Sequence, residues 1–280
     1  MTQTVQRRAD ARRRYDGLLP RRLLRWRPPA WWQELAIIAI GYALYTLGRD
    51  AIPQQASIAR WHAQDIAHLQ ATLHLNWERA VNRFVAGHEV LAQVLDYYYA
   101  TLHFVITLGV LVWLFRRRPH VYRGARTVLV ATTLLGLLGF YLYPTAPPRL
   151  LPGLGYVDTV LRFHTWGSLA DPDIADRSNQ YAAMPSLHFA WALWCGLVIF
   201  MCARRVWVRL LGLCYPAGTF VAIIGTGNHF VLDAIAGGFV VLLGFGAQWL
   251  LSGHGAFVPP PDAPARVTAP APVPAPAGQP

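Results

Sequence analysis

Three short stretches of this sequence carry residues that could handle a phosphate group. The first reads Met-Pro-Ser-Leu-His-Phe, from Met184 to Phe189, and lies between a polar, proline-bearing loop and an apolar run. Pro185 and Ser186 are typical helix-opening residues, so they place His188 in the first turn of a helix. Unpaired backbone N–H groups and the helix dipole favour an anion at that position. The stretch therefore indicates a phosphate site.

The other two stretches supply an imidazole paired with a carboxylate, and a guanidinium. His229 follows a Gly-Asn pair at the start of another apolar run, and Asp233 comes four residues later, a spacing that lets the two side chains meet on one helix face. Arg149 ends a proline-rich loop that follows a third apolar run. Each pattern alone is common, and a His-Asp pair at this spacing is more often structural than catalytic. The order of all three is what favours a catalytic site.

That order resembles the type 2 phosphatidate phosphatase superfamily, which shares its site with vanadium haloperoxidases. The resemblance covers roughly residues 90 to 250. It implies that His229 attacks phosphorus and becomes a phosphohistidine, that Asp233 orients the ring, and that His188 serves as acid and then as base. It also implies a set of phosphate-binding groups, namely Arg149, Ser186, the backbone amide of Leu187 and, with weaker support, Asn228. No metal and no cofactor is implied.

The sequence departs from the superfamily pattern at four positions. Leucine stands where the family has a lysine, a proline and a glycine, and isoleucine stands where it has an arginine: Leu142, Leu150, Leu187 and Ile223. These departures resemble most the inositol phosphorylceramide synthase-like branch, whose members move a phospho-head-group. We therefore expect a phosphotransferase that passes a phosphoryl or phospho-head-group from a lipid phosphate to a polyol such as inositol, or to water.

The missing cationic residues leave a less positive pocket, which fits a phosphodiester better than a monoester dianion. Arg162 or Arg177 could restore the charge. Two alternatives stay open at this point: a simple lipid phosphate or prenyl diphosphate phosphatase, and a catalytically silent lipid-binding membrane protein. The complete set of histidines, aspartate, arginine and serine argues against the silent protein.

Composition places the chain in a membrane. Hydrophobic residues make up 54% of the 280 positions and charged residues only 14%, which is unusual for a soluble domain. All 25 basic residues are arginine, and they gather in short tracts beside apolar runs, as in cytoplasmic membrane anchors that contact anionic lipid. The net charge of +11 therefore indicates a bilayer partner and not nucleic acid.

The apolar runs predict an all-α, polytopic bundle of six transmembrane helices. The expected spans are residues 31–47, 88–115, 122–142, 187–203, 206–225 and 229–252. Residues 54–86 are expected to form one or two helices along the outer interface or capping the bundle. Residues 143–185 are expected to form a long active-site loop. The catalytic membrane domain would then cover 31–253, between a cytoplasmic arginine-rich tail, 1–30, and a disordered Pro/Ala-rich tail, 254–280.

Ionisable residues inside the second span need a polar environment. Asp96 and His103 lie seven apart on one stripe of that helix with Tyr99 between them, and these three residues are candidates for contact with the substrate or acceptor. Asp96 and His103 could equally satisfy each other or neighbouring residues. Three other histidines, His62, His68 and His74, are six apart and share no helix face, so they do not predict a metal site.

The distribution of arginine predicts the orientation. With both termini in the cytoplasm, 18 arginines fall inside and seven outside. The same orientation puts Arg149, His188 and His229 together on the outer side of the plasma membrane, where a lipid phosphate can reach them. The sequence leaves the oligomeric state open.

Overall fold

The computed structural model describes residues 17–20, 27–50, 55–165 and 180–259. The far ends of both predicted tails, residues 1–16 and 260–280, lie outside the described residues, as does Arg177. The described chain is all-α apart from one isolated bridge between Thr145 and Ala182, so the all-α part of the predicted fold class is confirmed.

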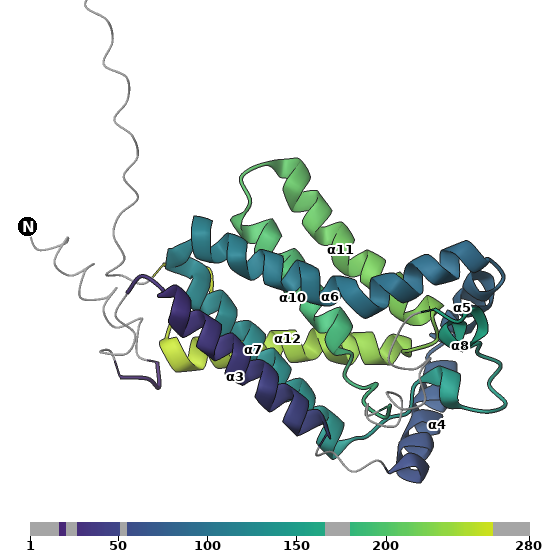
Figure 1. Ribbon diagram of the computed structural model, residues 1–280. Coiled ribbons are helices and arrows are strands. Elements are labelled where there is room, and N and C mark those ends of the chain that lie inside the picture. The colour runs from purple at the N-terminus through teal and green to yellow at the C-terminus, as the bar shows by residue number, and fades with distance from the viewer. Residues whose placement is uncertain (1–16, 21–26, 51–54, 166–179, 260–280) are drawn as a thin grey trace, which may run out of the picture.

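The six apolar runs predicted from the sequence all fold as helices, and the segment 54–86 folds as two more. The long helices are α3 (Trp31–Asp50), α6 (Glu89–Arg117), α7 (Pro119–Leu142), α10 (Leu187–Cys202), α11 (Val206–Gly225) and α12 (Val231–Ser252). The shorter ones are α4 (Ala56–Thr72), α5 (Glu78–Ala86), α8 (Thr159–Phe163) and the 3-10 turn η1 (Pro148–Leu150). The long helices run along the molecule, and α4, α5 and α8 gather at one end (Figure 1).

Four of the described helices, α6, α7, α11 and α12, are long and apolar enough to cross a membrane. Helix α10 is equally apolar but has 16 residues. Only 22% of the most apolar 18-residue stretch of α6 is buried inside the protein, and large side chains such as Leu108 and Val112 are exposed. Such a surface suits lipid tails, because a soluble protein rarely exposes apolar patches of this extent. The chain is therefore an integral membrane protein, with four candidate spans.

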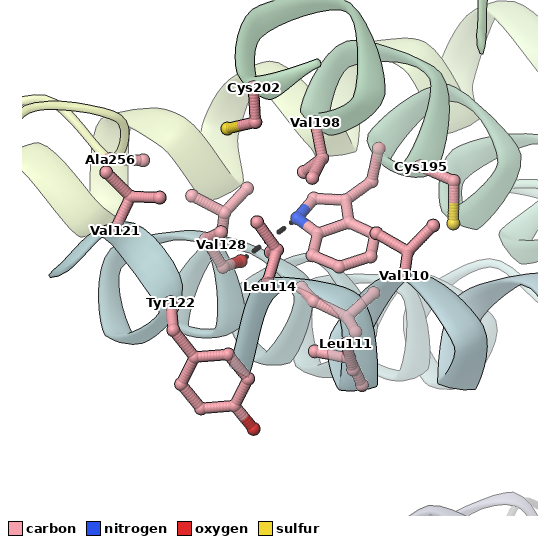
Figure 2. Close-up of a cluster of buried hydrophobic side chains, with 13 residues drawn as sticks. Val110, Leu111, Leu114, Val121, Tyr122, Val128, Cys195, Val198, Cys202 and Ala256 are labelled. Atoms are coloured by element: carbon pink, nitrogen blue, oxygen red, sulfur yellow. Dashed lines mark hydrogen bonds between the residues drawn. The ribbon is translucent and has the colours of Figure 1, made fainter. Parts of the chain in front are cut away.

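The main apolar core lies where α6 ends and α7 begins, and the second half of α10 packs against it (Figure 2). Trp194 is fully buried there, and its indole N–H donates to the carbonyl oxygen of Ala125 at 3.0 Å. This bond satisfies the one polar atom of the largest side chain in the core. This core therefore packs the helices together at the end of the bundle that lies far from the starts of α10 and α12.

The opposite end is closed by α4. Its Ala59, Ala63 and Ile66 pack with Leu151 and Phe230 in a second apolar cluster. The backbone N–H of Ala146 donates to the carbonyl oxygen of Ala59, which ties the loop after α7 to the same helix. Helix α4 therefore packs on this end of the bundle, and the predicted place of this segment relative to the membrane interface stays a prediction.

Helices α10 and α12 approach closely at Gly237. A Cβ added there would lie 2.5 Å from the carbonyl oxygen of Ser186, well inside contact distance. The backbone N–H of Ser186 donates to the carbonyl oxygen of Asp233 at 2.9 Å, one turn earlier on α12. Gly237 therefore lets the start of α10 bond to the backbone of α12.

We expect Gly237→Ala to destabilise the protein by about 1–3 kcal/mol, because the new methyl group must push Ser186 away from α12. The neighbouring Gly238→Ala is a matched control, since its Cβ would meet only side chains at 3.7 Å and beyond. In that control, the free energy of unfolding is expected to rise by about 0.5–1 kcal/mol, because alanine favours a helix more than glycine does. Unfolding of both purified variants in detergent, followed by circular dichroism, measures the difference; equal stability would contradict the close contact.

Candidate functional site

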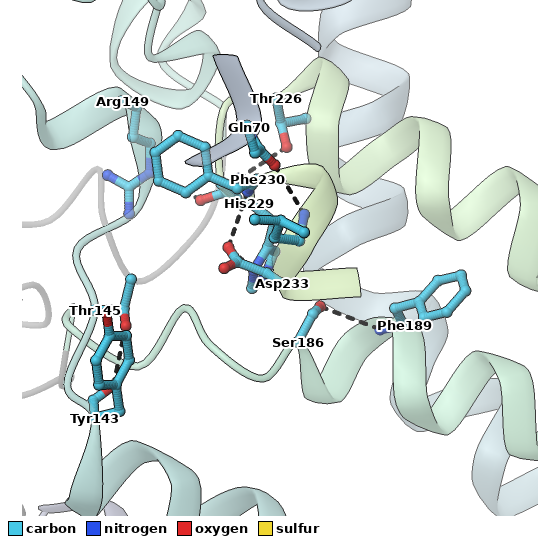
Figure 3. Close-up of polar contacts among 12 residues, drawn as sticks. Gln70, Tyr143, Thr145, Arg149, Ser186, Phe189, Thr226, His229, Phe230 and Asp233 are labelled. Atoms are coloured by element: carbon cyan, nitrogen blue, oxygen red, sulfur yellow. Dashed lines mark hydrogen bonds and ion pairs between the residues drawn. The ribbon is translucent and has the colours of Figure 1, made fainter. Parts of the chain in front are cut away.

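The start of α12 holds the predicted imidazole and carboxylate together. Nδ1 of His229 lies 3.3 Å from Oδ2 of Asp233, and both side chains are almost completely buried. The same oxygen accepts from the backbone N–H of Phe230 at 2.9 Å. Asp233 therefore caps its own helix while it holds the ring of His229, as Figure 3 shows.

The prediction that His229 lies on a helix is wrong, although the predicted contact between His229 and Asp233 is present. Helix α12 begins at Val231, with Phe230 as the preceding cap residue, so His229 lies just before the helix. The carboxylate of Asp233 binds the Phe230 N–H, and that interaction starts the helix later than the apolar pattern predicts. A capping contact, and not a shared helix face, brings the two side chains together.

A tight turn presents the imidazole. Gly227 adopts a φ of +71°, which favours glycine, and the backbone N–H groups of Asn228 and His229 both donate to the carbonyl oxygen of Ile223 at 3.1 Å. Nε2 of His229 is buried and has no hydrogen-bond partner among the described residues. A proton on Nδ1, beside the carboxylate, leaves the lone pair on Nε2. The ring thus presents a nucleophilic nitrogen.

The predicted helix start before His188 is confirmed. Ser186 is the cap residue of α10, and its Oγ accepts from the backbone N–H of Phe189 at 3.4 Å. The backbone amides of Leu187 and His188 lie in the first turn and have no hydrogen-bond acceptor among the described residues. The rings of His188 and His229 are 6.0 Å apart between centroids. Two imidazoles and free N–H donors therefore meet at the starts of α10 and α12.

Arg149 is fixed beside this point (Figure 3). Its Nε donates to Oδ1 of Asn228 at 2.8 Å, its Nη1 donates to Oδ2 of Asp158 at 3.0 Å, and its backbone N–H donates to the carbonyl oxygen of Gly227. The guanidinium keeps further N–H groups for an anion. The Nδ2 of Asn228 donates to Thr226, so this amide positions Arg149, and its direct contact with phosphate stays a prediction.

Tyr99 and His103 lie against His188, and their contact with a substrate or acceptor stays a prediction. Tyr99 stacks on His188 with ring centroids 4.1 Å apart, and His103 meets the same ring edge-on at 4.4 Å. A cavity of about 10 Å³ lies among these three side chains and Ile223, which is room for about one water molecule. Water or an alcohol hydroxyl at this point would lie against His188.

Asp96 is satisfied by neighbouring residues, which is one of the two readings that its place in the second span left open. Its two carboxylate oxygens accept from the hydroxyl groups of Thr159 at 2.6 Å and Thr165 at 2.8 Å. Both threonines belong to the long loop, so Asp96 anchors that loop to α6. Arg162 is exposed, with its guanidinium 5.4 Å from the ring of Phe163, and the structure does not bring it to His229.

A buried polar network behind the site was not predicted. The side chain of Gln70 donates to Glu78 at 2.6 Å and accepts from the backbone N–H of Leu232 in the first turn of α12. Tyr156 donates to the same Glu78 carboxylate at 2.7 Å, and burial together with this carboxylate raises the pKa of the phenol. Asp158 was also missed. Its only sequence signal is its place before a short helix, where its Oδ1 accepts from Leu161.

The net positive charge near the candidate site is low. Leu142, which stands in the place of the family's lysine, is 66% exposed at the end of α7, and Ile223 is fully buried. The guanidinium of Arg149 is itself paired with a carboxylate. No group of three or more His, Cys, Asp and Glu that could hold a metal occurs in the part of the chain that the structure describes.

Together these residues offer a nucleophilic nitrogen, a second imidazole, a guanidinium and helix N–H donors, the set that phosphoryl transfer requires. Residues 64–247 match the model of the PAP2 superfamily. A phosphoinositol dihydroceramide synthase from Bacteroides thetaiotaomicron is 24% identical over 189 residues, which make up 61% of this chain and 59% of that relative. The aligned part thus spans about three fifths of the relative. No solved structure matches the chain.

Proposed function

Because the chain belongs to the PAP2 superfamily, we propose that it transfers a phosphoryl or phospho-head-group from a lipid phosphate to an alcohol such as inositol. It is an integral membrane enzyme of the lipid phosphatase and phosphotransferase class. The choice of transferase rests on the site's charge. Arg149 is the described guanidinium that reaches the start of α12, and Asp158 offsets part of its charge.

A low positive charge favours a phosphodiester donor. A monoester dianion carries about one negative charge more near neutral pH, since its second pKa is about 6. A diester keeps its head-group during transfer, which is what a head-group transferase needs. The similar synthase is named for a product that contains phosphoinositol and dihydroceramide, so both a polyol and a lipid alcohol belong among the acceptors to be tested.

In the proposed reaction, Nε2 of His229 attacks phosphorus and forms an N–P bond while the P–O bond to the leaving alcohol breaks. His188 gives its proton to the leaving oxygen. The acceptor hydroxyl then loses its proton to His188 and attacks phosphorus, which breaks the N–P bond and restores His229. Asp233 holds Nδ1 and stabilises the positive charge that forms on the ring.

The phosphate oxygens are held by Arg149 and by the start of α10. Arg149 offers N–H groups that Asn228 and Asp158 leave free, and the hydroxyl of Ser186 and the amide of Leu187 complete the set. Tyr99 and His103 lie against His188, where the acceptor hydroxyl would enter. His229 is 3% exposed, so the phosphate enters only when neighbouring side chains move.

Hydrolysis is the second candidate. The cavity beside His188 has room for about one water molecule, and a water there would take the position of an acceptor hydroxyl. The enzyme would then be a lipid phosphate phosphatase.

We expect the purified enzyme in detergent to convert labelled phospholipids with an alcohol acceptor, either inositol or a ceramide-like lipid alcohol, into a new phosphoalcohol product. A panel of phospholipids and prenyl phosphates, each with and without acceptor, separates the two candidates by chromatography. Free phosphate at the same rate in every condition would favour the phosphatase and overturn the transferase.

We also expect a phosphohistidine at His229. Rapid acid-free quench of wild type with labelled donor should trap a protein-bound label that is acid-labile and base-stable. His229→Ala should lose the label and at least about 1,000-fold in turnover, while His74→Ala, on the exposed turn after α4, should keep both. A wild-type enzyme that turns over without any bound label would rule out the covalent step.

We further propose six spans, with α3 and α10 added to the four candidates and both termini in the cytoplasm of a plasma-membrane protein. The support is the arginine count: the tracts at 116–126 and 204–209 lie at one end of the helices, and Arg149, His188 and His229 lie at the other. The phosphate chemistry would then take place at the outer face, with residues 143–185 over the head-group.

Single-cysteine labelling of intact cells tests this orientation on a background without Cys195, Cys202 and Cys214. Leu161→Cys, on the exposed face of α8, should react with a membrane-impermeant maleimide, and Arg116→Cys at the far end of α6 should react only after lysis. The reverse pattern would place the site at the cytoplasmic face.

A further inference from the structure

A groove of about 840 Å³ opens between α6, α10 and α11 at the end of these helices that lies away from His188 and His229. It is bordered by the last half of α6, the end of α10 and the start of α11. The candidate site lies at the first half of α6, the start of α10 and the end of α11. The groove is therefore a separate feature of the same three helices.

The walls of the groove are apolar. On α6 they run from Val105 through Gly109 and Trp113, and Ile199 and Val208 face them from the other two helices. From Val105 to Arg117 the helix rises about 18 Å. Half of a hydrocarbon core that is about 30 Å thick is about 15 Å. The groove thus has the length of an acyl chain within one leaflet.

The rim of the groove is cationic. Arg117, Arg118, Arg204 and Arg205 lie together where α6 ends and α11 begins. Arg118 is half-buried and donates to the carbonyl oxygen of Cys202 at 2.6 Å. The other three are exposed, and no carboxylate among the described residues pairs with them. Glu34, in the first turn of α3, is already paired with Arg126.

We propose that this groove binds an anionic phospholipid of the leaflet opposite to the candidate site, with one acyl chain along α6 and the phosphate among the four arginines. Guanidinium groups bind phosphate through paired N–H donors, and the apolar wall accepts the chain. A head-group with a net negative charge neutralises the positive charge of the arginines at the rim. A zwitterionic lipid or an apolar protein segment carries no net negative charge, so it would leave the rim positive.

This lipid is not the substrate. Its phosphate at Arg117 would lie about 21 Å along α6 from His103, the residue that contacts His188. No single phosphate reaches both places. Phosphate binding at the rim and phosphoryl transfer are therefore separate properties, and the groove is tested without measuring turnover.

The test compares the binding of phosphatidylglycerol and phosphatidylcholine to purified protein in detergent, measured by lipid retention in native mass spectrometry and by the shift in unfolding temperature. Arg117→Gln combined with Arg204→Gln and Arg205→Gln should weaken phosphatidylglycerol binding about 100-fold, since each arginine near a phosphate contributes roughly fivefold. Phosphatidylcholine binding should be weak in every variant.

The variant Gly109→Leu tests the apolar wall of the groove separately from the arginines at its rim. A Cβ added at Gly109 meets no atom within 4 Å, and Gly109 lines the groove, so the leucine side chain is expected to occupy the groove and leave the arginines in place. It should weaken phosphatidylglycerol binding at least tenfold, whereas Gly246→Leu, equally free of neighbours on α12, should not. Undiminished binding in Gly109→Leu, equal binding of the two lipids, or self-association that Gly109→Leu abolishes in the absence of lipid would each overturn the proposal.

Discussion

The candidate site depends on one buried carboxylate. Asp233 has no exposed surface, and a carboxylate in such a place is stable only when it is paired and hydrogen-bonded. Its Oδ2 contacts the ring of His229 and the backbone N–H of Phe230, and its carbonyl oxygen accepts from Ser186. One residue therefore starts α12, orients an imidazole and joins α12 to the start of α10.

The remaining polar residues at this end support that arrangement from behind. Gln70 bonds to the first turn of α12, and Glu78 bonds to both Gln70 and Tyr156, so the capping helices and the long loop are tied to the same point. Asp96 holds the loop from a third direction through two threonine hydroxyls. Because these groups are largely shielded from water, losing any one partner would leave a buried polar group unpaired, at a cost of about 1–3 kcal/mol.

The two ends of the helices have opposite electrostatic character. The candidate site has an arginine that is partly offset by an aspartate, whereas the far end exposes arginines that no described carboxylate pairs with. An electrically balanced site suits a donor of low charge, and an unbalanced rim suits a bound anion. The same three helices, α6, α10 and α11, thus carry the proposed site for chemistry at one end and the proposed lipid site at the other.

The sequence determined the features that depend on neighbours along the chain. The six apolar runs became helices with nearly the predicted bounds, Ser186 became a helix cap, and Asp233, which caps α12, reached back to His229 four residues earlier. Local sequence decides such features because each involves one turn of backbone or one apolar stripe. The order of the three stretches also indicated the superfamily before any contact was known.

Tertiary structure alone decided which partners the polar residues take. Asp96 binds threonines 63 and 69 positions away, Arg149 binds Asn228 79 positions away, and Leu232 binds Gln70 across 162 positions. No periodicity encodes such pairs, because they form only when separate helices and loops meet. The sequence by itself named the residues that could do the chemistry. Only the fold shows that Asp96 anchors a loop, that Asn228 positions Arg149, and that Leu142 is largely exposed at the end of α7.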